Sequence, residues 1–151
     1  MDAAVKPQGC THLRLRQLLR SVAQRYDAEL ATVGLKGAQY SLLSYVAKLG
    51  PIRPGDLARE IRTGASTLTR NLEPLIDAGW VTLSPGPDGR SRLVNITPAG
   101  RDKRQEAQRR WRAAQESINQ SLGVQRVLAL HALVDECMDL LPASPDANET
   151  E

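Results

Sequence analysis

Along most of the chain, apolar residues recur every three or four positions, which is the spacing of one face of an α-helix. In the first segment these positions include Leu15, Leu18, Val22 and Tyr26. Glycines, prolines and capping residues predict where each helix begins and ends. One proline, Pro74, lies inside the fourth predicted helix, removes a backbone hydrogen bond and predicts a kink. The helices predicted before residue 80 cover residues 12 to about 34, 37–49, 54–61 and 66–78.

Between residues 80 and 97 the pattern changes to one that is typical of a β-hairpin. Trp80–Leu83 contains strand-forming residues, and Arg92–Ile96 alternates apolar with polar positions. Ser84–Gly89, between them, is a concentrated turn signal. Thr97-Pro98 then supplies a helix cap and a proline at the first helical position. The two C-terminal helices predicted after it cover residues 98–122 and 124–141.

A short helix, a tight turn, a second helix and a hairpin, in that order, predict a winged helix-turn-helix. The expected fold class is mostly α with a small β-hairpin wing (α+β), with the terminal helices forming a dimerisation region. In such a fold the second helix enters the DNA major groove with its N-terminal residues at the base edges. Hydroxyl and guanidinium groups bond both bases and phosphates. The residues that this helix offers are Ser66, Thr67, Thr69 and Arg70.

The tip of the hairpin offers a second set of candidate DNA contacts: Asp88, Arg90 and Arg92. An arginine at a loop tip can enter the narrow, electronegative minor groove, and Asp88 can hold Arg90 in a fixed pose by a charge-assisted bond. Serine and threonine at a helix start are also ordinary caps, and hairpin arginines are also ordinary surface residues. The pattern by itself is therefore also compatible with a helical protein that does not bind DNA.

Composition and charge add a basic region and exclude several classes. The 151 residues carry 20 Lys and Arg against 17 Asp and Glu, with 16 of the 20 being Arg. Residues 1–112 are net basic and residues 113–151 net acidic, and the two largely cancel to give the formal charge of +3. The basic first three-quarters of the chain suggests a polyanion partner. The apolar runs are too short to span a membrane, and the start lacks the apolar core of a signal peptide. We therefore expect a cytoplasmic protein.

No catalytic motif is present, so the sequence predicts neither an enzyme nor a bound cofactor. Four residues with thiol or imidazole groups, Cys10, His12, His131 and Cys137, have spacings that match no compact zinc motif, and no metal site is predicted.

The motifs of the middle of the chain resemble those of the MarR (multiple antibiotic resistance regulator) family. Leu57–Ile61, Ser66–Leu72 and Leu75–Val81 are similar to its helix-turn-helix, and Asp88–Ser91 matches its Asp-x-Arg wing motif. Ile96–Gly100 resembles the Leu-Thr-x-x-Gly segment that follows the wing. The match spans roughly residues 13–141, in order and at the expected spacing. Departures, such as Arg53 before the third helix and Gly64 before the fourth, affect the expected DNA preference rather than the fold.

The resemblance implies a homodimeric transcriptional regulator, often a repressor, that binds double-stranded DNA at a pseudo-palindromic operator. It also implies release by a small-molecule effector bound between the dimerisation and DNA-binding parts. Tyr40 and Trp111 are candidate lining residues for that pocket, although residues of this kind more commonly belong to an ordinary core. The domains expected are a flexible lead (1–11), dimerisation helices (12–35 and 98–141), the winged helix-turn-helix (36–97) and a disordered tail (142–151).

Two alternatives to this function stay open at the level of sequence. The first is a redox-sensing regulator that uses Cys10, Cys137 or both, because some relatives sense organic peroxides through a cysteine in the first helix. A disulfide between subunits would need the Cα atoms to come within about 7 Å. The second is a winged-helix module that binds proteins, although such a module has no need of arginines on both the groove helix and the wing tip.

Overall fold

The computed structural model describes residues 6–142, so residues 1–5 of the expected lead and 143–151 of the expected tail lie outside the described part. The described chain folds into six helices and one antiparallel hairpin, which confirms the predicted fold class and element order. The elements are α1 (Thr11–Ala31), α2 (Gly37–Leu49), α3 (Pro54–Glu60), α4 (Ala65–Asp77), β1 (Val81–Pro85), β2 (Arg92–Ile96), α5 (Pro98–Leu122) and α6 (Val124–Leu140).

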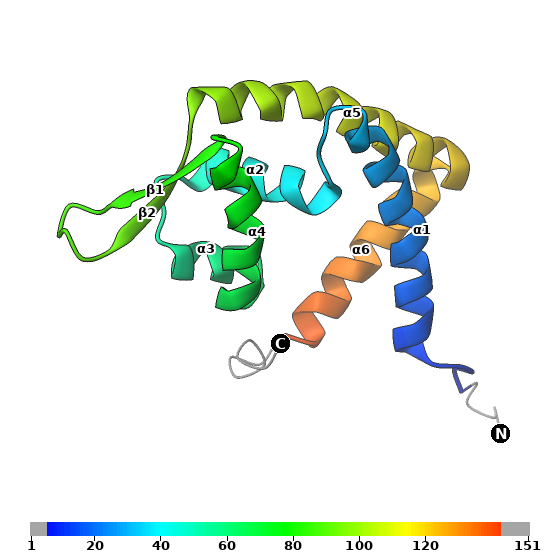
Figure 1. Ribbon diagram of the computed structural model, residues 1–151. Helices are drawn as coiled ribbons and strands as arrows, with labels where there is room; N and C mark the ends of the chain where they lie inside the picture. Colours follow the sequence, from blue (N-terminus) through cyan, green and yellow to red (C-terminus); the bar gives the residue numbers. More distant parts are fainter. Residues whose placement is uncertain (1–5, 143–151) are drawn as a thin grey trace.

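Helix α5 organises the molecule. It runs across the top of Figure 1, with α2, α3, α4 and the hairpin gathered below its N-terminal part. Helices α1 and α6 project downward beneath its C-terminal part as two arms. Thr97 caps α5, because its hydroxyl accepts a hydrogen bond from the N–H of Gly100 at 3.0 Å and donates one to the carbonyl of Gly79 at 2.6 Å. This one side chain therefore links the start of α5 to the end of α4.

The hydrophobic core lies in the part that carries the hairpin, and apart from Tyr40 its buried side chains are aliphatic. The central leucines Leu43, Leu57 and Leu75 are fully buried there, between α2, α3 and α4. From α1 only Leu30, near its C-terminal end, reaches full burial, so the rest of the apolar face predicted for that helix is not covered within the chain. The arms are thus attached to the core at one end only.

The hairpin pairs β1 with β2 from Val81↔Ile96 to Pro85↔Arg92, and an isolated bridge joins Ile52 to Val94 at its base. The expected strand start at Trp80 is wrong by one residue. The N–H of Trp80 instead donates to the carbonyl of Leu75 at 2.9 Å, so Trp80 belongs to the turn that ends α4.

Helix α4 begins one residue earlier than expected, at Ala65, and continues past Pro74 to Asp77. Gly79 follows it with a φ of +78°, the left-handed conformation that glycine adopts without steric cost at the end of a helix. Helix α4 therefore ends just before Gly79, as the sequence predicts.

Candidate nucleic-acid interface

Helix α4 has one buried and one exposed face, as its sequence period requires. Leu68, Leu72 and Leu75 are buried against the core. The opposite face begins in the first turn and presents Ser66, Thr69 and Arg70 as exposed side chains, with Thr67 half-buried beside them. The four residues predicted for DNA contact on this helix therefore lie together at its N-terminal end.

Thr69 and Arg70 make local contacts that leave much of their bonding capacity directed outward. The hydroxyl of Thr69 donates to the carbonyl of Ala65 at 3.0 Å, one turn back. The Arg70 guanidinium approaches the Thr67 hydroxyl at 3.5 Å. A guanidinium carries five N–H donors in a planar fork, so most of the donors of Arg70 can meet an acceptor outside the chain.

The turn before α4 fixes how this helix is presented. Arg62 has a φ of 55°, in the left-handed region, and stands where helices commonly end on glycine. Its N–H bonds to the carbonyl of Arg59 at 3.2 Å, and the N–H of Thr63 bonds to the carbonyl of Ala58 at 3.0 Å. This pair of bonds closes α3, and Gly64 then serves as the N-cap residue of α4.

At the hairpin tip, one carboxylate oxygen of Asp88 organises the turn. It accepts hydrogen bonds from the N–H of Arg90 at 3.1 Å, the N–H of Ser91 at 3.0 Å and the hydroxyl of Ser91 at 2.8 Å. These bonds, those from Ser91 first, lower the pKa of the Asp88 carboxyl to about 2 from its usual value of 3.8, and Arg53 adds a small electrostatic contribution in the same direction. Asp88 is therefore ionised throughout the physiological range.

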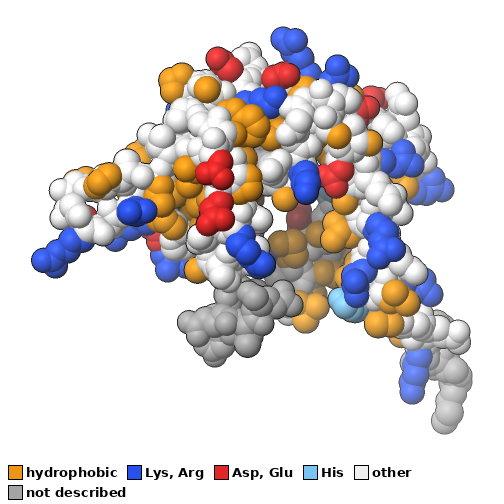
Figure 2. Space-filling view, in the orientation of Figure 1, with side chains coloured by type: hydrophobic (Ala, Val, Ile, Leu, Met, Phe, Trp, Pro, Cys, Tyr) orange, Lys and Arg blue, Asp and Glu red, His pale blue; other side chains and the backbone are white. Residues whose placement is uncertain are grey.

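Asp88 holds the backbone of Arg90 rather than its guanidinium. Within the described residues, no ion pair joins the Asp88 carboxylate to the Arg90 guanidinium. The guanidinium groups of Arg90 and Arg92 are exposed, and Figure 2 shows Lys and Arg side chains reaching outward at the tip of the hairpin, on the left. Asp88 thus bonds to Arg90 through the backbone N–H, which shapes the loop and leaves the arginine side chain available.

The Asp88 carboxylate gives the wing a pH dependence of known sign. Because its pKa is lowered in the folded protein, its contribution to wing order is complete above pH 4 and is lost as the pH falls toward 2. We expect amide exchange at Ser91 to be constant from pH 5 to 8 after correction for intrinsic rates. Asp88→Ala should speed it across that whole range, whereas Asp88→Asn, which keeps one acceptor oxygen, should have a smaller effect. Equal exchange in all three proteins would contradict this account of the tip.

Arg53, which the sequence marks as a departure from the family pattern able to reach a phosphate, joins the candidate site. Arg53 is the N-cap residue of α3, is exposed, and acts electrostatically on Asp88 at the hairpin tip. Its neighbour Ile52 bridges to Val94 of β2, so Arg53 lies next to the base of the wing. Its closeness to the wing depends on tertiary packing and could not be read from the sequence.

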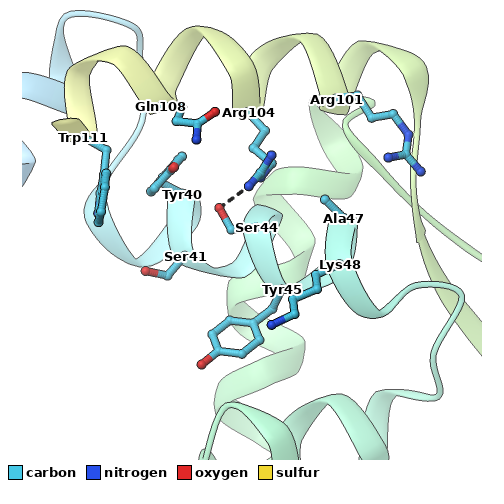
Figure 3. Close-up of a pocket in the computed structure, with 10 residues that line it drawn as sticks. All are labelled: Tyr40, Ser41, Ser44, Tyr45, Ala47, Lys48, Arg101, Arg104, Gln108 and Trp111. Carbon is cyan, nitrogen blue, oxygen red and sulfur yellow. Dashed lines mark hydrogen bonds between the residues drawn. The ribbon is translucent and has the colours of Figure 1, made fainter.

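Between α2 and α5 lies an open cavity of about 600 Å³ (Figure 3). Trp111 and Tyr40, the two predicted lining residues, come together there with ring centroids 6.3 Å apart. The guanidinium of Arg104 extends from α5 and donates to the Ser44 hydroxyl at 3.3 Å. The residues that line the cavity are Tyr40, Ser41, Ser44, Tyr45, Ala47, Lys48, Arg101, Arg104, Gln108 and Trp111.

Trp111 separates this cavity from a second one of about 470 Å³ that opens between α1 and α2. Trp111 and Ser41 line both, and the ring of Tyr26 on α1 lies 6.3 Å from that of Trp111. Tyr40 is 7% exposed and also belongs to the core. Helices α1 and α5 and the helix-turn-helix part thus meet around Trp111. Sequence reasoning missed the basic residues of the first cavity, because the crossing of α2 and α5 brings them together.

Both cysteines are exposed and unbonded. Cys10 is the N-cap residue of α1 and Cys137 lies in α6, so each belongs to a different arm. Among the described residues, no group of three or more His, Cys, Asp or Glu side chains is arranged to hold a metal ion. Within the same part of the chain, no helix has the length and apolar content needed to cross a bilayer.

Comparisons with known proteins agree with this geometry. A family model described as the MarR family matches residues 33–91. An HTH-type transcriptional regulator of Mycobacterium leprae is 31% identical over 72% of this chain and 76% of its own length. A second such regulator, YwoH of Bacillus subtilis, is 29% identical over 62% of this chain and 68% of its own.

Two solved structures that contain DNA have the same fold. The Mycobacterium tuberculosis transcriptional regulator MosR, solved in complex with DNA, is 31% identical with a TM-score of 0.69, over 85% of this chain and 98% of its own. A mutant of Escherichia coli MarR, complexed with operator DNA, has a TM-score of 0.75 over 83% of this chain and 91% of its own. At 22% identity, the second likeness concerns the fold.

Proposed function

The chain belongs to the MarR family of transcriptional regulators, and we propose that it acts as a homodimer that binds a pseudo-palindromic operator and represses transcription until a small-molecule effector releases it. The observation that carries the DNA-binding part is the exposed polar face at the start of α4, together with the outward arginines of the wing. The complexes of MosR and MarR with DNA support the same assignment.

In the proposed complex, α4 enters the major groove and the wing lies over the neighbouring minor groove. Arg70 and the hydroxyls of the first turn of α4 face the base edges, where an arginine fork can bond guanine at two atoms. Arg90, held out by the loop that Asp88 organises, reaches the minor groove or its phosphates. Arg53, at the start of α3, contributes a phosphate contact.

Homodimer formation is proposed because the arms expose large apolar side chains that a single chain leaves uncovered. On α1 these include Leu15 at 57% and Leu19 at 65% exposure, and on α6 Leu128 at 57% and Leu140 at 73%. Burying one such side chain contributes about 1.5–3 kcal/mol. A second copy, related by a twofold axis, covers both arms at once and gives the two recognition helices the symmetry of a palindrome.

The effector is proposed to bind around Trp111, where α1 and α5 meet α2. A molecule that binds between α2 and α5 changes the position of α4 relative to the dimer axis. It weakens DNA binding to the extent that it binds this changed conformation more tightly than the DNA-binding one. Trp80→Phe leaves Trp111 as the only tryptophan. We expect a panel of phenolic acids to include at least one that quenches this fluorescence and releases operator DNA over the same concentration range.

Trp111→Leu tests the same cavity in the release assay, with Arg109→Ala, an exposed change elsewhere on α5, as its control. The Leu variant should need at least about tenfold more of the active compound for release, since an aromatic contact of about 0.5–1.5 kcal/mol and its packing are lost. Release at unchanged concentration would move the effector site away from Trp111.

Selection of bound duplexes from a random pool by the full-length chain tests the proposed function. The expected product is an inverted repeat with half-site centres about 34–36 Å apart. Recovery of no enriched sequence would contradict specific DNA binding, and a single unrepeated element would contradict the dimer.

A redox-sensing regulator is the second candidate, because both thiols are exposed, as a sensor thiol must be. Under this alternative, peroxide produces a chain-to-chain disulfide on non-reducing electrophoresis together with loss of operator binding, and Cys10→Ser, Cys137→Ser or both abolish the effect. Unchanged affinity after peroxide treatment would exclude it.

A further inference from the structure

One exposed face of α2 runs past both of the cavities that meet at Trp111. Ala38, Ser41, Tyr45 and Lys48 recur at the spacing of one helix face, and all four side chains are exposed. Ala38 and Ser41 line the second cavity, whereas Ser41, Tyr45 and Lys48 line the first. Because a helix rises about 1.5 Å per residue, this face extends about 15 Å from Ala38 to Lys48. The two cavities are therefore consecutive parts of one groove, here called the α2 groove, and they adjoin at Ser41 and Trp111.

The two ends of the α2 groove differ in charge. The end in the first cavity is lined by three cations, Lys48, Arg101 and Arg104, and by no acidic side chain. The charged residues that line the end in the second cavity are one acid, Asp27, and one base, Lys36. A net positive charge is therefore confined to the end of the groove between α2 and the start of α5.

The three cations are not neutralised by acids of the described chain. Among its residues, none of the ion pairs includes Lys48, Arg101 or Arg104. Arg104 is half-buried, and its guanidinium points from α5 toward α2, where its partner is the neutral hydroxyl of Ser44 (Figure 3). Removing a cation from water is costly unless an anion accompanies it. This end of the groove is therefore suited to a group with more than one negative charge.

Beyond Trp111, the walls of the α2 groove are mainly hydrocarbon. The aliphatic side chains there are Leu19, Val22, Ala23, Leu30 and Ala38. The Asp27 carboxylate at this end accepts a hydrogen bond from the N–H of Gly37 at 2.8 Å, and its charge disfavours a second anion beside it. Apolar groups gain free energy by leaving water for such a surface. A bound molecule therefore places its apolar part at this end and its anionic part at the other.

We propose that the α2 groove binds an amphipathic phosphate, a single alkyl or acyl chain that carries a phosphoryl group. The chain lies in the apolar end beside Trp111, and the phosphoryl oxygens accept hydrogen bonds from Lys48, Arg101 and Arg104. Guanidinium groups match phosphoryl oxygens in geometry as well as in charge. The inference rests on the effector site proposed around Trp111, and it names the chemical class of the molecule that fills that site.

Other classes of ligand satisfy only part of the groove. A phenolic acid brings one negative charge to three cations and fills one cavity at a time. Inorganic phosphate or a nucleotide meets the cations but leaves the aliphatic end uncovered. A fatty acid covers the aliphatic end but again carries a single charge. A molecule with a chain and a phosphoryl group matches both ends.

A series of chain lengths tests the apolar end. Isothermal titration calorimetry of the full-length chain would compare inorganic phosphate with butyl, hexyl, octyl and decyl phosphate, each below its micelle concentration. We expect the affinity to rise by about tenfold for every two added methylene groups until the apolar end is filled. Ala38→Phe, a change at an exposed position, narrows this end. It should reduce the rise with chain length and leave the binding of inorganic phosphate unchanged.

A change of headgroup tests the cationic end. Lys48→Gln/Arg101→Gln should bind decyl phosphate at least about tenfold more weakly than wild type, since two charged contacts are lost. The same variant should bind decanol as wild type does, which also shows that it is folded. Arg109→Gln removes a cation of α5 that lies outside the groove, and it should bind both compounds normally.

Release of operator DNA by decyl phosphate, over the concentration range in which it binds, would support the inference. Equal affinity for decyl phosphate and decanol, or an affinity that does not rise with chain length, would overturn it. If a phenolic acid acts at Trp111 and releases DNA while the alkyl phosphates do neither, the inference fails and the proposed effector site stands. If neither class of compound acts at Trp111, both fail.

Discussion

Replacing Arg90 with alanine is expected to weaken binding to the selected operator by about tenfold or more without changing the fold. The side chain is exposed at a tip whose backbone is held by Asp88, so its removal leaves the hydrogen bonds of the loop intact. Because a dimer loses two cationic contacts, the slope of log affinity against log salt should fall by about 2. The loss should be similar for operator and for random DNA, since backbone and minor-groove contacts carry little sequence information. Fluorescence anisotropy at several salt concentrations measures both quantities.

Arg70→Ala provides the contrast, because this side chain lies on the α4 face assigned to the base edges. It should weaken operator binding by a similar factor but random DNA much less, and a renewed selection should tolerate more bases at one position of each half-site. Arg109→Ala removes an exposed arginine of α5 and should bind as wild type. Wild-type affinity and salt slope in both Arg70→Ala and Arg90→Ala would remove these residues from the DNA interface.

Gly100→Ala is expected to destabilise the fold by about 3 kcal/mol or more, which corresponds to a fall in Tm of about 6–12 °C for a chain of this size. A Cβ at this position would overlap the carbonyl oxygen of Trp80 and stand 2.8 Å from Cγ1 of Ile96. Backbone atoms form most of that obstacle, so no side-chain rotation relieves it. Differential scanning calorimetry measures the change.

Gly55→Ala is the matched control, because an added methyl group there meets nothing within 4 Å and the residue lies in the first turn of α3. It should be neutral or more stable by up to about 1 kcal/mol, since alanine is the better helix former. Equal stability of the two alanine variants would show that the contact between the start of α5 and Trp80 is looser than described.

Local sequence signals were sufficient wherever the backbone alone decides the structure. Thr97-Pro98 places the start of α5, Gly123 separates it from α6, and the leucine period of α4 identifies its buried face. The start of the hairpin could not be obtained in this way, because the hydrogen bond of Trp80 to Leu75 belongs to the end of the preceding helix.

The candidate site also has parts that local sequence predicts and parts that depend on the tertiary fold. The exposed face of α4 follows from its period of 3.6, and the wing tip from its turn residues. What required the fold was the association of distant segments: Arg53 with the wing, and Arg104 with Ser44 in the cavity beside Trp111. The role of each arm is also hidden in sequence, because an apolar stripe predicts a helix face without showing whether the same chain covers it.

Hydroxyl-radical footprinting of the full-length chain on its selected operator tests the central claim most directly. The account predicts protections related by a twofold axis, with two major-groove contacts centred about 34–36 Å apart and a flanking minor-groove protection on each side. The flanking protections should disappear in Arg90→Ala while the central ones persist. A footprint without twofold symmetry, or flanking protections that survive in Arg90→Ala, would contradict the placement of α4 and the wing on DNA.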